Sequence, residues 1–319
     1  MIYAFNGDAD GLCALQQLRL ATPGDARLVT GVKREIALLD RISAEPGEHV
    51  IVLDVSFDIN RASVLRLLAS GANILYFDHH FSGDIPSNSH LATFINTSPD
   101  ICTSIIVDCY LQGKHKEWAI VGAFGDGMPA VAQAMAMACG ISEERSKELR
   151  ALGVCLNYNA YGETEADLLI PPISLAHLLM PHESPFGFIK ESVEFGLLQE
   201  GYERDLANAR NTEPYTDDGH AAVFILPKEK WSRRVNGVFG NWLAEEFPNR
   251  AHAILYTNSL GEFTVSVRAA MSNKRGADTF CRSFPTGGGR QGAAGINQLP
   301  TERLDEFVSK FQSEFGNQC

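Results

Sequence analysis

The chain has 319 residues, 45% of them hydrophobic, and carries 27 basic against 39 acidic residues, a formal charge of −12. This composition predicts a globular protein of two domains and excludes a disordered chain. The negative charge argues against a protein that coats long nucleic acid, although a small anionic ligand could still bind through a local basic pocket or a bridging metal. No apolar run could span a bilayer and no signal peptide is evident, so we expect a cytoplasmic protein with no membrane partner.

The first half of the chain alternates strand-like and helix-like runs. We expect strands near 1–6, 27–32, 49–55, 73–78 and 91–96, and helices near 11–21, 35–43, 58–70 and 102–112. This alternation is typical of βαβ units around a parallel sheet. Ligands of such sheets bind at the carboxyl ends of the strands.

The predicted strand at 74–77 is followed directly by Asp78, His79 and His80. Three titratable groups next to an apolar strand are costly to desolvate unless a cation lies among them. An Asp-His hydrogen bond that caps a loop would explain the motif equally well if it stood alone. The motif therefore needs support from other parts of the chain.

Other predicted strand ends supply that support. A single aspartate at such a position is more often a turn or capping residue, but four acidic endings in one domain indicate a shared site. The additional side chains are Asn6, Asp8 and Asp10 after the first strand, Asp54 after the apolar run at 49–53, and Asp126 after the apolar run at 119–125.

Beyond residue 117 the chain looks mostly helical as far as 211, and turn-forming residues at 211–219 suit a linker. Strand and helix patterns then resume, which predicts a second, smaller α/β domain. Its expected elements are strands at 221–226, 251–257 and 263–269 and helices at 232–247 and 301–315. We expect a first domain at 1–189, a linker helix and turn at 190–217, and a second domain at 218–319.

A run of glycines in the second domain predicts an anion-binding loop. Gly287, Gly288 and Gly289 offer unobstructed backbone N–H groups, and Arg290 adds a fork of donors suited to phosphate. A flexible loop is the simpler interpretation of three glycines, but the segment 267–290 carries five basic residues against one acid. On the predicted strand before it, Ser266 and Arg268 should face the same way, toward the glycines.

Taken together, these motifs resemble the DHH phosphoesterases with a DHHA1 C-terminal domain. That family includes nano-RNA-type oligonucleotide phosphodiesterases, RecJ-like exonucleases and cyclic-dinucleotide phosphodiesterases. The resemblance covers nearly the whole chain in the right order. It implies a metal-bearing N-terminal domain and a substrate-gripping C-terminal domain, with the active site in the cleft between them.

The resemblance also implies two Mn²⁺ ions. Carried over by position, Asp8 and Asp54 would hold one ion, and Asp10, Asp54, His79 and Asp126 would hold the other. The oxygen and imidazole ligands suit Mn²⁺ or Mg²⁺ and do not exclude Co²⁺ or Zn²⁺. His80 would contact the phosphate or the leaving oxygen, and Asp78 would orient an imidazole.

Two positions depart from the family pattern. Asn6 stands where His or Asp is usual, and its neutral amide is a weaker metal ligand, so the first ion should bind loosely. Arg290 stands where the family has His, which suggests an additional phosphate to bind or a guanine edge to recognise.

We therefore expect a Mn²⁺-dependent phosphodiesterase that cleaves short linear oligonucleotides, such as pGpG, to mononucleotides, with no long nucleic acid as partner. A homodimer is left open. Removal of phosphate from 3′-phosphoadenosine 5′-phosphate and opening of a cyclic dinucleotide are alternatives, and so is a nucleotide-binding sensor that has lost catalysis. The glycine-rich second domain disfavours a family II inorganic pyrophosphatase.

Overall fold

The computed structural model describes residues 1–316 of the chain. The protein divides into two compact units, Met1–Glu200 and Gly201–Cys319, each with its own hydrophobic core. The division falls inside the long helix α9 (Val193–Arg210), within the segment that the sequence assigns to the linker. Across the described residues, no helix is long and apolar enough to cross a membrane.

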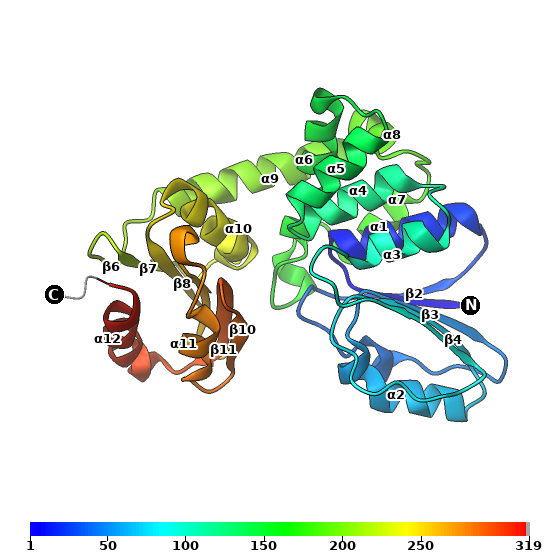
Figure 1. The fold of residues 1–319 in the computed structure, drawn as a ribbon, viewed down its shortest axis with the longest axis horizontal. Helices are drawn as coiled ribbons and strands as arrows, with labels where there is room; N and C mark the ends of the chain where they lie inside the picture. The colour runs from blue at the N-terminus through cyan, green and yellow to red at the C-terminus, as the bar shows by residue number, and fades with distance from the viewer. Residues whose placement is uncertain (317–319) are drawn as a thin grey trace. The chain divides into compact units, whose positions relative to one another are not determined.

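A five-stranded sheet forms the centre of the first unit (Figure 1). Its strands are β1 (Ile2–Phe5), β2 (Arg27–Val29), β3 (His49–Leu53), β4 (Asn73–Asp78) and β5 (Leu91–Ile95), in the order β2-β1-β3-β4-β5. All neighbours pair in parallel, and the register aligns Phe5 with Leu53 and Leu53 with Phe77. The parallel α/β architecture is thus confirmed, and the carboxyl ends of β1, β3 and β4 meet at one edge.

Helices lie on both faces of this sheet, and several of them stack in a further layer away from it (Figure 1). The helices of this unit are α1 (Ala9–Ala21), α2 (Phe57–Ala69), α3 (Thr103–Tyr110), α4 (Lys116–Gly125), α5 (Pro129–Ala138), α6 (Glu143–Asn159), α7 (Pro172–Leu179) and α8 (Pro185–Glu191), with 3₁₀ turns η1 (Leu38–Arg41) and η2 (Glu165–Asp167). On one face, α2 and η1 pack over Val50, Val52 and Tyr76. On the other face α1 packs against α3 and α4. Burial on both faces explains why the strands are nearly continuous apolar runs.

Two sequence predictions in this unit are wrong. The helix expected at 35–43 is only the short turn η1. The run at 119–125 was counted among the strand ends, but it belongs to the helix α4, as the mostly helical pattern beyond residue 117 indicates, and Asp126 is its C-cap. A helix that is buried all round is as uniformly apolar as a buried strand, so periodicity cannot separate the two.

The second unit contains a six-stranded, mostly antiparallel sheet in the order β10-β11-β9-β8-β7-β6 (Figure 1). Its strands are β6 (Thr216–Asp217), β7 (Ala221–Leu226), β8 (Ala251–Thr257), β9 (Phe263–Arg268), β10 (Gly287–Arg290) and β11 (Ala293–Leu299). Its helices are α10 (Lys230–Glu246), α11 (Ala277–Arg282) and α12 (Leu304–Phe315), with 3₁₀ turns η3 (Met271–Asn273) and η4 (Thr301–Arg303). One core joins the sheet to α11 and α12, and a second joins it to α10 and α9.

The glycine run is not the loop that the sequence predicts. Gly287, Gly288 and Gly289 lie in β10, which pairs with β11 through a short turn. Glycine is required here for close packing, because a Cβ atom on Gly287 would lie 1.7 Å from the carbonyl oxygen of Cys281. The glycines therefore support a hairpin whose ladder uses part of their backbone hydrogen-bonding capacity.

Candidate metal centre

The carboxyl ends of β3 and β4 bring predicted site residues together. Asp54 follows β3, His79 and His80 follow β4, and ligand atoms of the three lie within 4.8 Å of one another. Asp10 in the first turn of α1 and Asp126 at the end of α4 form a second group of this kind with His79. Because both groups contain His79, donors from four segments of the chain converge on one imidazole.

Backbone contacts fix the orientation of His79. Its Nδ1 atom lies 3.1 Å from the carbonyl oxygen of Ile101, which can only accept a hydrogen bond. The proton therefore sits on Nδ1, and the lone pair of Nε2 is free. Nε2 lies 3.4 Å from Oδ1 of Asp54 and 3.9 Å from Oδ2 of Asp126. This is the arrangement that metal-bound histidines adopt.

The N-terminus of α3 positions two of the carboxylates. The N–H groups of Ser104 and Thr103 donate to Oδ1 and Oδ2 of Asp10, each at 2.7 Å. The first N–H groups of a helix have no partner within the helix, so Asp10 satisfies them. The hydroxyl of Thr103 also donates to Oδ1 of Asp54 at 3.2 Å. The sequence analysis missed Thr103, because nothing in its local pattern links α3 to the strand ends.

The electrostatics of the cluster favour a bound cation. Burial raises the pKa of Asp54 well above its usual range, and the charges of Asp8 and Asp10 add to the effect. Burial and the charge of Asp10 raise the pKa of Asp126 to about 6. A divalent cation among these carboxyl groups would favour their ionised forms. Carboxylate oxygens with one imidazole nitrogen are suitable ligands for Mn²⁺ or Mg²⁺, so the residues present fit such an ion.

Asp78 binds His80 rather than joining the donor groups. Its buried side chain accepts hydrogen bonds through Oδ1 from Nδ1 of His80 at 2.7 Å and from the N–H of His79 at 2.8 Å. Burial lowers the pKa of His80, but the hydrogen bond to Asp78 and the negative charges of nearby aspartates together outweigh burial, so that the pKa is raised. Since Nδ1 is engaged, Nε2 is the nitrogen that His80 can offer to a ligand.

Asp8 and Asn6 belong to neither donor group in the part of the chain that the structure describes. Oδ1 of Asp8 accepts the N–H groups of Asp10 and Gly11, each at 3.1 Å, and Oδ2 lies 2.5 Å from Nζ of Lys33. Burial opposes ionisation of Asp8, but the charge of Lys33 and the hydrogen bonds that Asp8 accepts together outweigh burial and lower the pKa. The amide of Asn6 donates to the carbonyl oxygen of Lys33 at 3.4 Å.

In the second unit, two predicted substrate-binding arginines lie in one row across three strands. Arg290 on β10 is aligned with Ala293 on β11, which is aligned with Arg268 on β9. Residues aligned in this way point to the same face of a sheet. We call these three residues the arginine row. Arg268 is held on that face by Asn241 of α10, to whose Oδ1 atom its Nε donates at 2.9 Å.

A second row lies beside the first on the same face. Gly288 on β10 is aligned with Gly295 on β11, which is aligned with Ser266 on β9. Each member is two residues from a member of the arginine row, so both rows share one face. Nothing lies within 4 Å of the position that a Cβ atom on Gly288 would take. The two rows thus form an open strip of small residues flanked by basic side chains.

No protein-family model and no curated protein matches the sequence. Solved structures do match. A manganese-bound RecJ exonuclease aligns with 98% of this chain and 89% of its own, at 17% identity and a TM-score of 0.64. The pGpG-specific phosphodiesterase PggH of Vibrio cholerae aligns over 98% of both chains, at 13% identity and a TM-score of 0.59. This chain has the DHH fold of RecJ and PggH.

A third neighbour is RecJ from Thermus thermophilus in complex with Mn²⁺, at 17% identity and a TM-score of 0.61. The present chain aligns over 98% of its length but spans about half of that RecJ, 51%. At these identities the similarity establishes the DHH fold, and any activity has to follow from the residues of the site.

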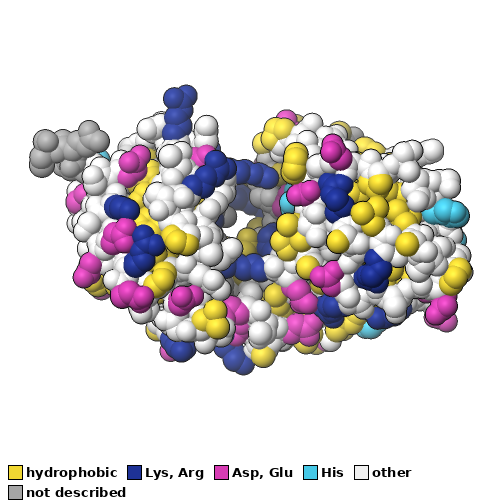
Figure 2. Space-filling view, turned by 90° about the horizontal axis from the view of Figure 1, so that it is seen from below, with side chains coloured by type: hydrophobic (Ala, Val, Ile, Leu, Met, Phe, Trp, Pro, Cys, Tyr) yellow, Lys and Arg dark blue, Asp and Glu magenta, His cyan; other side chains and the backbone are white. Residues whose placement is uncertain are grey.

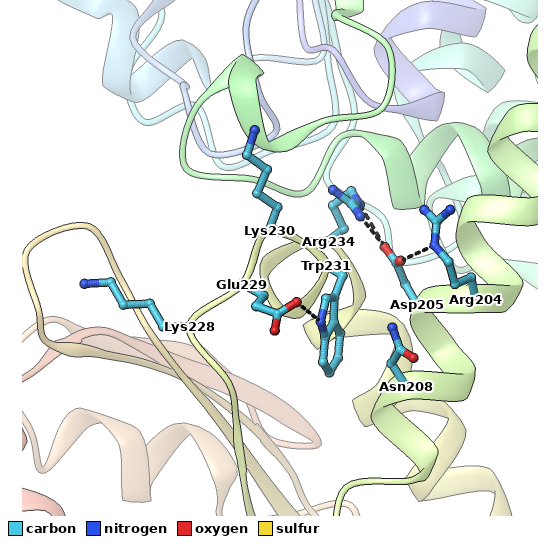
Figure 3. A pocket seen from close by; sticks show the side chains of 8 residues that line it. All are labelled: Arg204, Asp205, Asn208, Lys228, Glu229, Lys230, Trp231 and Arg234. Carbon is cyan, nitrogen blue, oxygen red and sulfur yellow. Dashed lines mark hydrogen bonds and ion pairs between the residues drawn. The ribbon is translucent and has the colours of Figure 1, made fainter.

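The DHH fold of this chain also carries a pocket that the sequence analysis did not anticipate. A cavity of about 630 Å³ in the second unit is lined by residues of α9, of α10 and of the segment before α10 (Figure 3). Trp231 donates its Nε1 hydrogen to Glu229 at 2.8 Å, and Arg234 pairs with the buried Asp205 at 2.7 Å. None of the predicted substrate-binding residues lines it. The alternating basic, acidic and aromatic run at 228–231 was the available signal.

Proposed function

We propose that this protein is a metal-dependent phosphodiesterase that hydrolyses short linear oligonucleotides to mononucleotides, with 5′-phosphorylated dinucleotides such as pGpG as its substrates. The observation that carries the proposal is the convergence of Asp10, Asp54 and Asp126 on the imidazole of His79. The DHH fold, which RecJ and PggH share, supports it.

The donor cluster around His79 would hold a divalent cation. The two RecJ neighbours contain manganese, which supports Mn²⁺, with Mg²⁺ or Co²⁺ as substitutes. When bound, such an ion acidifies a coordinated water and offsets the charge of the phosphate. The described residues offer two groups of ligands that share His79, and Asp8 lies in neither group.

His80 is suited to act as the proton donor to the leaving oxygen. The hydrogen bond to Asp78 keeps Nδ1 protonated and directs Nε2 to the ligand side. The raised pKa keeps the imidazolium form at a higher pH than usual, so Nε2 can give a proton to the departing alkoxide. Asp78 is fixed in turn by the N–H of Phe57 at 3.2 Å.

The second unit would bind the terminal phosphate. Arg268 and Arg290 flank the strip formed by Ser266 and Gly288, which suits a phosphate oxygen or a guanine edge. On the face of each unit that Figure 2 shows, basic and acidic side chains are interspersed. That pattern and the charge of −12 favour a short substrate over a long strand.

A substrate panel tests the proposal. With Mn²⁺ present, pGpG and pApA should be cleaved faster than longer oligonucleotides, 3′-phosphoadenosine 5′-phosphate and cyclic dinucleotides. Preferred cleavage of the bisphosphate nucleotide or of a cyclic dinucleotide would replace the proposal with the corresponding alternative. Binding without turnover at any Mn²⁺ concentration would indicate a sensor.

A further inference from the structure

Lys33 places a positive charge next to Asp8, where the sequence analysis expected the first divalent ion. It follows β2, and its Nζ atom lies 2.5 Å from Oδ2 of Asp8 and 2.9 Å from Oδ1 of Asn157. The ring of Tyr161 lies on another side, with its centroid 5.4 Å from Nζ. The ammonium group of Lys33 is thus surrounded by a carboxylate, an amide oxygen and an aromatic ring, which are groups that stabilise a positive charge.

The backbone of Lys33 is anchored on both sides. Its N–H donates to the carbonyl oxygen of Ala160 at 3.0 Å, and its own carbonyl accepts the side-chain N–H of Asn6 at 3.4 Å. Asn6 therefore holds the segment that delivers the lysine. Only about a quarter of the Lys33 side chain is exposed, so the ammonium is part of the site rather than a mobile surface charge.

Both oxygens of Asp8 already have partners. Oδ1 accepts two backbone N–H groups and Oδ2 pairs with Lys33. Among the described residues, no group of three potential ligands includes Asp8. A divalent ion at Asp8 would have to displace the ammonium or lie beside it, and both Asn6 and Asn157 are neutral.

Repulsion between like charges also argues against a second divalent ion. When ionised, the four carboxylates contribute −4, and Lys33 with one divalent ion contributes +1 and +2, or +3. A second divalent ion would raise the positive charge to +5 and place two like charges in contact. The carboxylates counted are Asp8, Asp10, Asp54 and Asp126.

We propose that the ammonium group of Lys33 takes the place of a second divalent cation, so that the centre holds one divalent ion beside a fixed lysine. The inference rests on the proposed metal-dependent phosphodiesterase and specifies its centre. Two of the three N–H donors of Lys33 are used by Asp8 and Asn157. The third can bind an oxygen of the scissile phosphate.

Counting bound ions tests this inference without reference to turnover. The full chain is titrated with Mn²⁺, and the electron paramagnetic resonance spectrum distinguishes an isolated Mn(II) from a coupled pair. The wild type should bind one isolated ion, and Asp8→Asn should keep it. Lys33→Met uncovers Oδ2 of Asp8 and should bind a second, coupled ion. Lys147→Met, which changes a lysine 73% exposed on α6, should behave as the wild type.

The outcomes separate this inference from the proposed function. A coupled pair in the wild type, loss of an ion in Asp8→Asn, or a single ion in Lys33→Met would overturn the role of Lys33 and leave the phosphodiesterase standing. One isolated ion in an inactive wild type would overturn the proposed function and support the assignment of Lys33.

Thermal unfolding tests the inference even if Lys33→Met folds poorly. Lys33→Met leaves the Asp8 carboxylate without its partner, so its unfolding temperature should fall in metal-free buffer and recover with Mn²⁺ by more than that of the wild type. Lys33→Arg keeps a cation and should respond to Mn²⁺ as the wild type does. An equal response of the two variants would contradict the inference.

Discussion

Asp54 combines an uncommon backbone conformation with a central place among the donors. Its φ of 58° lies in the left-handed region, which residues other than glycine seldom adopt. Its N–H still donates to the carbonyl of Phe77 at 3.0 Å, so the turn begins directly after the sheet ladder. Because such conformations persist at functional sites where surrounding structure holds them, we infer that the turn serves to aim the carboxylate at His79.

Replacing Asp54 should therefore remove the metal and the activity together. Asp54→Asn keeps the size of the side chain and removes its charge, and we expect Mn²⁺ binding to be lost and turnover to fall by roughly 10³-fold. Asp58→Asn is the matched control, because Asp58 is exposed and pairs with Arg61 on α2. Calorimetric Mn²⁺ titration and the rate of pGpG hydrolysis measure both effects. Full activity in Asp54→Asn would rule out a ligand role.

Proton competition should make Mn²⁺ binding depend on pH. In the metal-free fold the pKa of Asp126 is raised from 3.8 to about 6, and the pKa of Asp54 is raised as well. Because the ion needs the ionised forms, its affinity should fall as the pH drops through 6, and binding should release protons. Titrations in buffers of different ionisation enthalpy measure this release. An affinity that stays constant across pH 6 would contradict the prediction.

The raised pKa of Asp126 should also make the stability of the metal-free protein depend on pH. A carboxyl group whose folded-state pKa is raised favours the fold while it is protonated and opposes it once ionised. The metal-free protein should therefore lose stability as the pH rises from 3.8 toward 6, and Mn²⁺ should offset that loss above pH 6. Thermal unfolding with and without Mn²⁺ over this range would show the difference.

At the level of elements, strands were easier to predict than the contacts between them. The strands of the first unit are nearly continuous apolar runs because helices bury both faces of the sheet. The same signal was misleading for α4, which is buried all round. Lys33 could not be predicted, because it gains its role only when the fold brings Asp8 and Asn157 to it. The donors Asp10, Asp54 and His79 could be proposed, since strand-end positions are visible in the sequence.

The β10–β11 hairpin allows a test with two adjacent glycines. Gly287→Ala would place a Cβ atom 1.7 Å from the backbone oxygen of Cys281, and we expect it to destabilise the protein by about 1–3 kcal/mol. Gly288→Ala meets nothing within 4 Å and should leave stability nearly unchanged. It lies on the face of Ser266, however, so it should raise KM for pGpG. Equal losses of stability in both variants, or an unchanged KM in Gly288→Ala, would contradict this view of the hairpin.

At the scale of the whole molecule, the proposed metal ligands and the proposed substrate-binding residues lie in different units. Asp10, Asp54, His79 and Asp126 belong to the first unit, and the arginine row belongs to the second. Substitutions in the two units should consequently change different quantities. A substitution of a proposed metal ligand should alter metal binding and kcat, whereas a substitution in the arginine row should alter KM.

Arg290→Ala tests this separation. Losing an exposed, bidentate phosphate donor should raise KM for pGpG by roughly 10-fold or more, since a charged hydrogen bond contributes about 1.5–3 kcal/mol. Mn²⁺ affinity and kcat should stay unchanged, because Arg290 contributes no atom to the donor cluster. Arg282→Ala on α11 is the matched control, as it removes an exposed arginine of the same unit outside the arginine row. A loss of Mn²⁺ binding in Arg290→Ala, or a KM increase shared equally by Arg282→Ala, would show that recognition does not depend on the arginine row.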